Sequence, residues 1–359
     1  MTDLSFLPEC LPTAVGSLPH QDPGQACALV QRYLPEIPAW PQLPRRDFRE
    51  SIYAQYSAGF PGTVLSRDRL YVDRARDLGP ELERLYTHYL EADSQAAALD
   101  AEYAAGLARF LTLDFPRARA VKGQVIGPVS WGLTLTDQDR RAILYDEALA
   151  DAMAKHLRLS AAWQEHALRQ LAPQTIMFVD EPHLASVGSA HVAVAREQIV
   201  ALLEEVFAGL RGLKGVHCCG NTDWGLVLET SLDILSFDAY NYGETIALYP
   251  QVVRAFLQRG GLLAWGIVPV SDAAQVSAET AAGLADRLEA AWRALAARGV
   301  PFDDLVSTAL ITPACGLGTL PEPAAERALA LTAEVSQRLR QRYFPGSAAA
   351  DPHPAVHPN

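Results

Sequence analysis

The chain has 359 residues, of which 49% are apolar, 8% aromatic and 20% charged. This composition supports a folded core and excludes wholesale disorder, and the length fits one large α/β domain or two average ones. The net charge is −12, from 30 basic and 42 acidic residues, and no cluster of Lys or Arg is present. We therefore expect no nucleic-acid partner, because such a partner requires a basic patch or stripe.

The sequence gives no sign of export or of membrane insertion. Its opening stretch, MTDLSFLPECLP, lacks the basic segment and long apolar run of a signal peptide. No uninterrupted apolar stretch approaches the roughly 20 residues that cross a bilayer. The 5 cysteines are too few and too unevenly spaced for a disulfide framework. We expect a soluble, cytoplasmic protein with no membrane partner.

The predicted elements begin with a strand over 13–17, and the proline-rich stretch 37–43 is either a second strand or a loop. After about residue 95, short apolar runs alternate with long amphipathic stretches. Six strand–helix pairs are predicted: 118–126 with 147–170, 175–179 with 193–210, 215–218 with 224–230, 233–237 with 250–258, 261–268 with 278–298, and 305–312 with 322–340. Such alternation predicts parallel βαβ units.

Seven or eight βα units in one chain favour an α/β fold of the closed (β/α)₈ TIM-barrel type over an open sheet. We expect a single barrel catalytic domain over 1–345. Residues 44–95 fit the repeat poorly and are predicted to form an insertion near the barrel mouth. The low-complexity stretch 346–359 is predicted to be a disordered tail.

In such barrels the chemistry lies at the carboxyl ends of the strands. His217 and Cys219 are two residues apart at one such end, so an extended chain directs both side chains to the same face. Cys218 then faces the other way, as a small buried hydrophobe. Cys315 follows a strand further round the barrel and can close on the same point.

A His/Cys/Cys set with a carboxylate as fourth ligand suits zinc, because thiolates and imidazole select that ion. The alternative is a core histidine bonded to backbone, with two inert thiols. The placement of all three residues at strand ends favours the metal.

Two carboxylates, Asp180 and Glu181, follow another apolar strand. They can cap the next segment, which is a common use of Asp, or they can bind an ammonium group. Ser17, at the end of the first predicted strand, could bind a carboxylate through its hydroxyl or backbone N–H. The second interpretation would suit an amino-acid substrate.

With these residues in view, the sequence resembles the catalytic C-terminal domain of cobalamin-independent methionine synthase. More loosely, it resembles the uroporphyrinogen decarboxylase-like barrels that include corrinoid-dependent methyltransferases. The matching stretches, in the family's order over most of 13–320, are Gly16-Ser17-Leu18-Pro19, Lys122-Gly123, Gly127-Pro128-Val129-Ser130, Val179-Asp180-Glu181-Pro182, His217-Cys218-Cys219 and Cys315-Gly316-Leu317. No stretch resembles the family's separate N-terminal barrel, so we expect a stand-alone core form.

The resemblance implies a zinc methyltransferase with homocysteine as substrate and methionine as product. Carried over, the zinc ligands are His217, Cys219 and Cys315. Asp180 would hold the amino group of homocysteine, with Glu181 beside it. Ser17 would help to bind the polar end of the amino acid.

Two departures from the family pattern matter. Where the methionine synthases have a glutamate ligand, the aligned residue is Asp238, with Glu244 in the following loop as the fallback. The histidine that would protonate a folate is also absent, since the aligned stretch is Gly266-Ile267-Val268-Pro269. Methyl transfer from a folate nitrogen needs a proton for the leaving amine, whereas a methyl-corrinoid needs none.

We therefore expect a methyl-corrinoid donor, carried by a separate corrinoid protein. His20 or His183 is the alternative source of the proton. Aromatic candidates for a corrinoid-facing surface are Trp40, Trp131, Tyr53 and Tyr56, although such residues are more often core packing.

Three other functions fit less well. A uroporphyrinogen-type decarboxylase needs a basic anchor, for which only Arg45 and Arg46 offer themselves, and it leaves the His/Cys/Cys set unexplained. Methyl transfer to another thiol, such as coenzyme M, uses the same zinc chemistry, but Asp180 favours an acceptor with an amino group. A non-catalytic zinc- or corrinoid-handling protein would carry the same ligands, and only turnover separates it.

Overall fold

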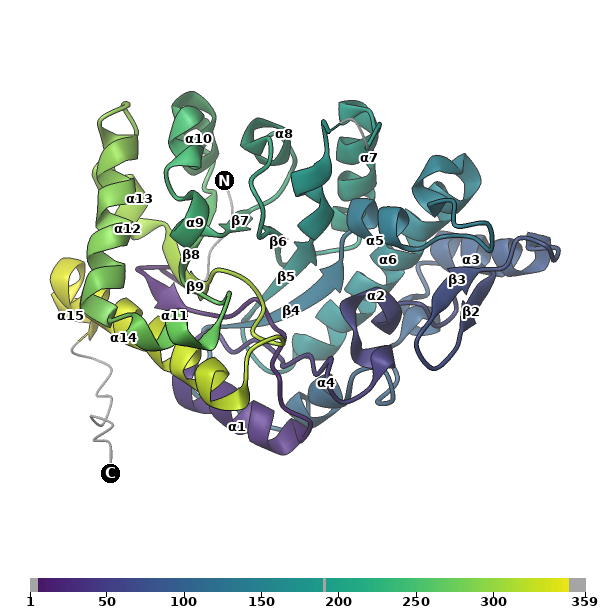
Figure 1. Cartoon of the computed structure of the whole chain (residues 1–359), viewed down its shortest axis with the longest axis horizontal. Coiled ribbons are helices and arrows are strands. Elements are labelled where there is room, and N and C mark those ends of the chain that lie inside the picture. The colour runs from purple at the N-terminus through teal and green to yellow at the C-terminus, as the bar shows by residue number, and fades with distance from the viewer. Residues whose placement is uncertain (1–5, 190–191, 349–359) are drawn as a thin grey trace.

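The computed structural model describes residues 6–189 and 192–348. Its centre is a curled sheet of seven parallel strands in the order β1-β9-β8-β7-β6-β5-β4, with helices around the outside (Figure 1). The strands are β1 Leu11–Pro12, β4 Ala120–Ile126, β5 Gln174–Asp180, β6 Leu213–Cys218, β7 Ile234–Phe237, β8 Leu262–Val268 and β9 Ala309–Pro313. Each of β4 to β8 neighbours the strand that follows it along the chain, as the predicted βαβ units require, and β9 pairs with β1.

Outside the segment 44–95 the described part of the chain forms thirteen α-helices. They are α1 Pro23–Tyr33, α4 Ala105–Phe110, α5 Pro128–Thr134, α6 Glu147–Leu168, α7 Arg196–Phe207, α8 Trp224–Leu228, α9 Ala239–Tyr242, α10 Pro250–Gln258, α11 Ala273–Ala278, α12 Ala281–Ala296, α13 Phe302–Ser307, α14 Glu322–Tyr343 and α15 Pro345–Ala348. Of these, α6, α7, α8, α10, α12 and α14 are the helices of the six predicted strand–helix pairs. None of the helices in the described ranges combines the length and apolar character needed to cross a membrane.

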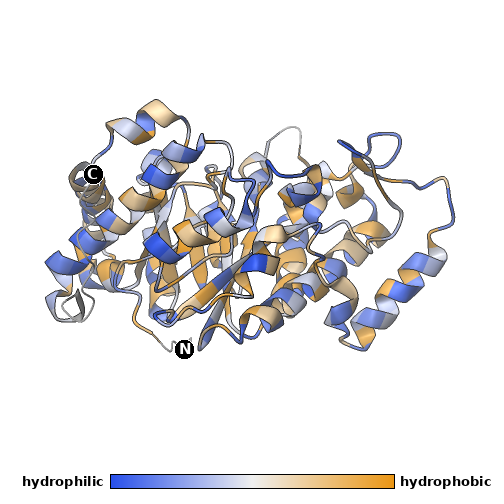
Figure 2. Ribbon diagram, turned by 90° about the horizontal axis from the view of Figure 1, so that it is seen from below, coloured by the Kyte–Doolittle hydropathy of each residue, from blue (hydrophilic) through white to orange (hydrophobic). Residues whose placement is uncertain are grey.

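The strands are buried on both faces, which explains why they read as continuous apolar runs in the sequence. Outside the sheet, side chains of the strands pack on the helices in one large core. Inside its curl lies a second core, which includes Ile176, Phe178, Leu213 and Leu310. Figure 2 shows the strands as hydrophobic ribbons surrounded by helices of mixed hydropathy.

The gap between the two edges of the sheet is spanned by the segment 36–42. Lys122 N–H donates to the Pro38 carbonyl on the β4 side, and Leu18 N–H donates to the Gln42 carbonyl on the β1 side, at 2.9 and 2.8 Å. Pro38 and Pro41 have no N–H, so this segment cannot form a continuous ladder. The regular sheet therefore has seven strands. The structure confirms a curled parallel sheet surrounded by helices, but not the predicted closed (β/α)₈ barrel.

Two predicted strands are wrong in their bounds. The first strand is Leu11–Pro12. Of the predicted stretch 13–17, Thr13 N–H still donates to the Ile311 carbonyl of β9 at 2.9 Å, but Gly16 then turns the chain with φ of +147°, and Ser17 forms an isolated bridge to Gln42. The predicted strand 305–312 begins at Ala309, since the residues before it form the end of helix α13.

The predicted insertion 44–95 holds helix α2 (Ile52–Gln55), an antiparallel hairpin of β2 (Thr63–Leu65) and β3 (Leu70–Val72), and helix α3 (Gly79–Leu90). The hairpin and α3 lie at one end of the molecule (Figure 1), where Tyr86 Oη donates to the Asp151 carboxylate of α6 at 2.6 Å. Of the predicted tail, 346–348 belong to α15, and 349–359 lie outside the described residues.

Candidate metal and substrate site

A pocket of about 710 Å³ opens at the carboxyl ends of the strands. Its lining includes Asp180 at the end of β5, His217 in β6, and two residues just beyond strand ends, Cys219 and Cys315. Ser17 lines it from the segment after β1. Five of the predicted site residues therefore lie around one cavity, at the position where α/β enzymes of this kind carry their chemistry.

His217, Cys219 and Cys315 offer ligand atoms that all lie within 4.8 Å of one another. The imidazole Nδ1 of His217 lies 3.0 Å from the Ser236 hydroxyl, while its Nε2 is buried without a hydrogen-bond partner. A hydrogen bond to one ring nitrogen orients a ligating histidine and leaves the other nitrogen for the metal. One imidazole and two sulfurs, with room for a further ligand from the pocket, fit the chemistry of a zinc site with an open position.

The two cysteines of this group interact directly. A hydrogen bond from Cys315 lowers the pKa of the Cys219 thiol, and the same contact raises the pKa of Cys315. Cys218, between His217 and Cys219 in the sequence, faces away from the group. Its thiol is fully buried and donates to the Gly220 carbonyl, and burial raises its pKa to about 12. The two thiols that face the group are therefore those of Cys219 and Cys315.

Asp180 lies beside His217 in the register of β5 and β6. Its side chain is buried, with only 5% exposed, and its Oδ1 has no hydrogen-bond partner. Burial raises the pKa of this carboxyl to about 6, against the opposing charge of Lys122. A carboxylate oxygen without a partner, in a pocket wall, is suited to bind a cationic group of a ligand.

Lys122 of β4 is fully buried, and its ammonium lies 3.4 Å from the side-chain oxygen of Gln124 on the same strand. Its ammonium donates to the Val15 carbonyl at 2.6 Å and lies 4.3 Å from the centre of the Phe178 ring. Burial lowers its pKa to about 8, and the nearby Asp180 opposes that change. In the sequence, a single lysine within an apolar strand is the pattern that could indicate a buried charge at this position.

Glu181 does not line the pocket, which corrects its predicted place beside the substrate. Its carboxylate accepts hydrogen bonds from the backbone N–H of Val129 and of Ser130 and from the Ser130 hydroxyl, at 2.9, 2.7 and 2.6 Å. It therefore caps the first turn of α5. A Cβ on Gly127 would lie 2.1 Å from this carboxyl carbon, so a larger residue there would displace the Glu181 carboxylate from its cap. Burial raises the pKa of Glu181 to about 7.

Neither predicted carboxylate ligand belongs to the group of close ligand atoms, although Asp238 lies near enough to His217 and Cys219 for their charges to act on it. Asp238 accepts from the backbone N–H and the side-chain amide of Asn241, at 2.8 and 2.7 Å, and so caps α9. Glu244 is exposed. In 6–189 and 192–348, the group of mutually close ligand atoms comprises His217, Cys219 and Cys315 without either carboxylate. The short Asp side chain is engaged by the helix that follows it.

Ser17 is held against the loop that follows β9. Its carbonyl accepts from Leu317 N–H at 2.8 Å, and its hydroxyl accepts from Gly318 N–H at 3.3 Å. A Cβ on Gly316 would lie 2.1 Å from that hydroxyl, so a larger residue there would displace the Ser17 side chain. This contact places Ser17 beside Cys315 at the pocket wall.

The candidate proton donors and most of the aromatic candidates lie outside the pocket. His20 and His183 do not line the pocket. Trp40, Trp131 and Tyr56 are fully buried, and the indole N–H groups of the two tryptophans donate to Gln164 and to the Tyr53 carbonyl. These three are packing residues.

Three residues of the predicted insertion, Arg45, Ile52 and Tyr53, do line the pocket. Their part in the site could not be read from spacing, because it depends on how a non-repeating segment folds back over the strand ends. Tyr53 is the one of the four aromatic candidates that lines the pocket, and burial raises the pKa of its phenol.

No family model and no curated protein matches the sequence. Among solved structures, the chain is similar to a B12-independent methionine synthase from Shewanella sp. W3-18-1, in complex with selenomethionine. The TM-score is 0.58 at 18% identity, over 94% of this chain and 99% of that one. At this identity the likeness establishes the fold: a mixed α/β architecture around a curled parallel sheet.

Proposed function

We propose that the protein is a zinc-dependent methyltransferase that transfers a methyl group to the thiol of homocysteine and so forms methionine. The observation that carries the proposal is the group of His217, Cys219 and Cys315, with ligand atoms within 4.8 Å, in the same pocket as the unpartnered carboxylate of Asp180. The methionine synthase neighbour, which is covered over almost its full length, supports it.

The three ligands are proposed to hold zinc, because the unpartnered Nε2 of His217 and the two thiols are the donor atoms that this ion prefers. A zinc ion held there would supply the positive charge that keeps a substrate thiol deprotonated near neutral pH. With three protein ligands, a position is left for a group from the pocket.

The residues around the metal site are proposed to hold the amino acid. Asp180 binds the ammonium group through its free Oδ1, while Ser17 and the loop after β9 border the place of the carboxylate. Asp180 acts in binding and orientation, which are the main requirements of a methyl transfer in line with the attacking sulfur. Ile52 and Tyr53 of the insertion line the same pocket and are proposed to shield it from water.

We propose a methyl-corrinoid, presented by a separate corrinoid protein, as the donor. A folate donor needs a proton for its leaving nitrogen. His217 is the one histidine that lines the described pocket, and its free nitrogen is assigned to the metal. The phenol of Tyr53, whose pKa is raised by burial, is a poor acid near neutral pH. The neighbour is described as B12-independent, so the donor is the point at which the two proteins are proposed to differ.

We further propose that the chain forms one catalytic domain over 1–345, in which the segment 36–42 serves as the irregular eighth strand of a (β/α)₈ barrel. The backbone bonds of this segment to β4 and to the stretch after β1 support this. A barrel closed in this way positions Ser17 opposite the ends of β5 and β6.

The test is methionine formation by zinc-loaded protein, with methylcobalamin and methyltetrahydrofolate compared as donors and coenzyme M compared with homocysteine as acceptor. We expect turnover with methylcobalamin and homocysteine. Turnover with the folate alone would refute the donor, and methylation of coenzyme M alone would refute the acceptor. No turnover with any pair, in protein that binds one zinc, would refute the proposed function.

A further inference from the structure

The pocket is much larger than an amino acid requires. Homocysteine occupies the volume of only a few water molecules, each of which takes about 30 Å³ in the liquid. The volume of the pocket is about 710 Å³. Volumes of this order accommodate ligands of the size of a drug or cofactor. Space is therefore left for the reactive end of a second ligand.

The positions of the charged residues divide the pocket into a floor and a rim. Asp180, with 5% of its surface exposed, lies with the metal-ligating group at the floor, and Arg45 is exposed at the rim. The amino and carboxyl groups of homocysteine share one carbon atom. An amino acid with its sulfur at the metal site and its ammonium at Asp180 therefore keeps its carboxylate at the floor.

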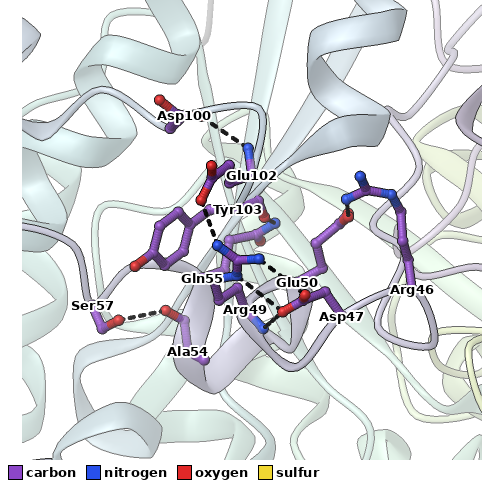
Figure 3. A network of polar contacts seen from close by, with 10 residues as sticks. All are labelled: Arg46, Asp47, Arg49, Glu50, Ala54, Gln55, Ser57, Asp100, Glu102 and Tyr103. Atoms are coloured by element: carbon purple, nitrogen blue, oxygen red, sulfur yellow. Dashed lines mark hydrogen bonds and ion pairs between the residues drawn. The ribbon is translucent and has the colours of Figure 1, made fainter. Parts of the chain in front are cut away.

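Arg45 differs from the arginines that follow it. Arg46 forms an ion pair with the buried Glu50 at 2.6 Å. Arg49 is held by Asp47 at 3.1 Å and by Glu102, as Figure 3 shows. These two guanidinium groups are engaged in a network that fixes the segment and do not line the pocket.

Arg45 lines the pocket and makes no ion pair within the described ranges. One of its nitrogens, Nη2, donates to the Thr319 carbonyl at 2.6 Å, which anchors the guanidinium against the loop after β9. The remaining N–H groups are left for a ligand, in the planar arrangement that suits carboxylate and phosphate.

A negatively charged second ligand would need a cationic side chain in this pocket, because the protein around it is negatively charged. The chain carries a net charge of −12, and Asp180 and two cysteines lie at the floor. Among the described lining residues, Arg45 is the one Arg or Lys. A cation at the rim offsets the repulsion that an anionic ligand would meet on approach.

We propose that Arg45 binds an anionic group of the methyl donor, a phosphate or a carboxylate, at the rim of the pocket. This inference rests on the proposed function and adds the chemical class of the donor. The phosphodiester of a corrinoid and the glutamate carboxylates of a folate are the two sources of that charge.

The experiment compares Arg45→Gln and Arg45→Lys with Arg254→Gln, a control at an exposed arginine of α10 outside the pocket. Binding of methylcobalamin and of methyltetrahydrofolate to the zinc-loaded protein is measured by fluorescence quenching, and KM values are measured for donor and homocysteine. We expect Arg45→Gln to weaken binding of the true donor and to raise its KM by roughly tenfold. Arg45→Lys should recover part of that loss, and the KM for homocysteine and the zinc content should not change.

The ligand whose binding depends on Arg45 identifies the source of the anionic group. Turnover with unchanged donor binding in Arg45→Gln would overturn this inference alone. A raised KM for homocysteine instead of the donor would also overturn it, because Arg45 would then bind the acceptor's carboxylate. A wild-type protein that turns over neither donor would refute the proposed function itself, and the inference with it.

Discussion

At the scale of single residues, the hydrogen bonding of the His217 ring is the strongest indication that the site binds a metal ion. Its Nδ1 is engaged by Ser236, and its Nε2 is buried with no hydrogen-bond partner. Leaving such an atom unsatisfied costs about 1–3 kcal/mol. A metal ion at the nearby sulfurs of Cys219 and Cys315 accounts for that cost, since it would use the nitrogen as a ligand.

Substituting a cysteine of the group tests the proposed metal site, and the same substitution at Cys218, outside the group, is the control. We predict that Cys315→Ala abolishes stoichiometric zinc and methyl transfer together, whereas Cys218→Ala, which removes a buried thiol facing away from the group, retains both. Zinc content is measured by mass spectrometry after gel filtration. Full zinc in Cys315→Ala would remove this residue from the site.

The free oxygen of Asp180 gives a second prediction. Asp180→Asn keeps the shape of the side chain but loses the charge that an ammonium group requires, so we expect the KM for homocysteine to rise by at least roughly tenfold. Zinc content should be unchanged, because this residue is not among the three close ligands. An unchanged KM, in steady-state assays at saturating donor, would contradict the assigned role.

A buried histidine away from the site gives a prediction about stability. His156 is buried against Phe60 and Trp131, its Nε2 donates to the Tyr56 carbonyl, and burial lowers its pKa to about 4 from 6.5. Between these values the unfolded chain binds more protons than the folded one, so stability falls as the pH drops from 6.5 to 4. The loss amounts to about 3 kcal/mol at most.

Urea unfolding of the wild type and of His156→Gln across this range measures the effect. We expect the advantage of the wild type to be full above pH 6.5 and to shrink toward pH 4. Parallel curves for the two proteins would show that this histidine is not buried in its neutral form.

At the scale of elements, the turn between β5 and the following segment serves two purposes. Asp180 ends the strand facing the pocket, and Glu181 turns away to cap α5 through three hydrogen bonds. We predict that Glu181→Ala lowers the free energy of unfolding by about 2–4 kcal/mol, because it leaves buried donors of α5 without an acceptor. Urea denaturation is the measurement.

Glu244→Gln serves as the matched control for that substitution, since it changes an exposed glutamate. We expect it to leave both stability and zinc content unchanged. Equal stability of Glu181→Ala and Glu244→Gln would mean that the cap does not hold α5.

Elements buried on both faces could be predicted from the sequence, and those with irregular backbones could not. The apolar runs of β4 to β8 fall within a few residues of their predicted bounds because helices cover one face and the inner core the other. The edge near β1 could not be predicted, because Gly16 and the prolines of 36–42 interrupt regular pairing. Helix α13 was missed because its short apolar run continues into β9.

At the scale of the whole molecule, the site joins residues from both ends of the chain. Ser17 meets the loop 316–318, and the proposed metal ligands come from the end of β6 and from the turn after β9. Parallel strand ends converge at one edge of a sheet, so their polar residues could be predicted to meet. Which carboxylates face the pocket could not be predicted, because Glu181 and Asp238 are taken up by local helix caps.

The central claim is that the pocket binds homocysteine with its thiol at the metal of the His217, Cys219 and Cys315 group. Calorimetric titration of homocysteine into zinc-loaded and metal-free protein, repeated in buffers of different ionisation enthalpy, tests it most directly. We predict tight binding with release of about one proton per homocysteine in the zinc-loaded protein only, because a thiol must lose its proton to reach the metal. Equal binding by the metal-free protein, or binding without proton release, would contradict the account.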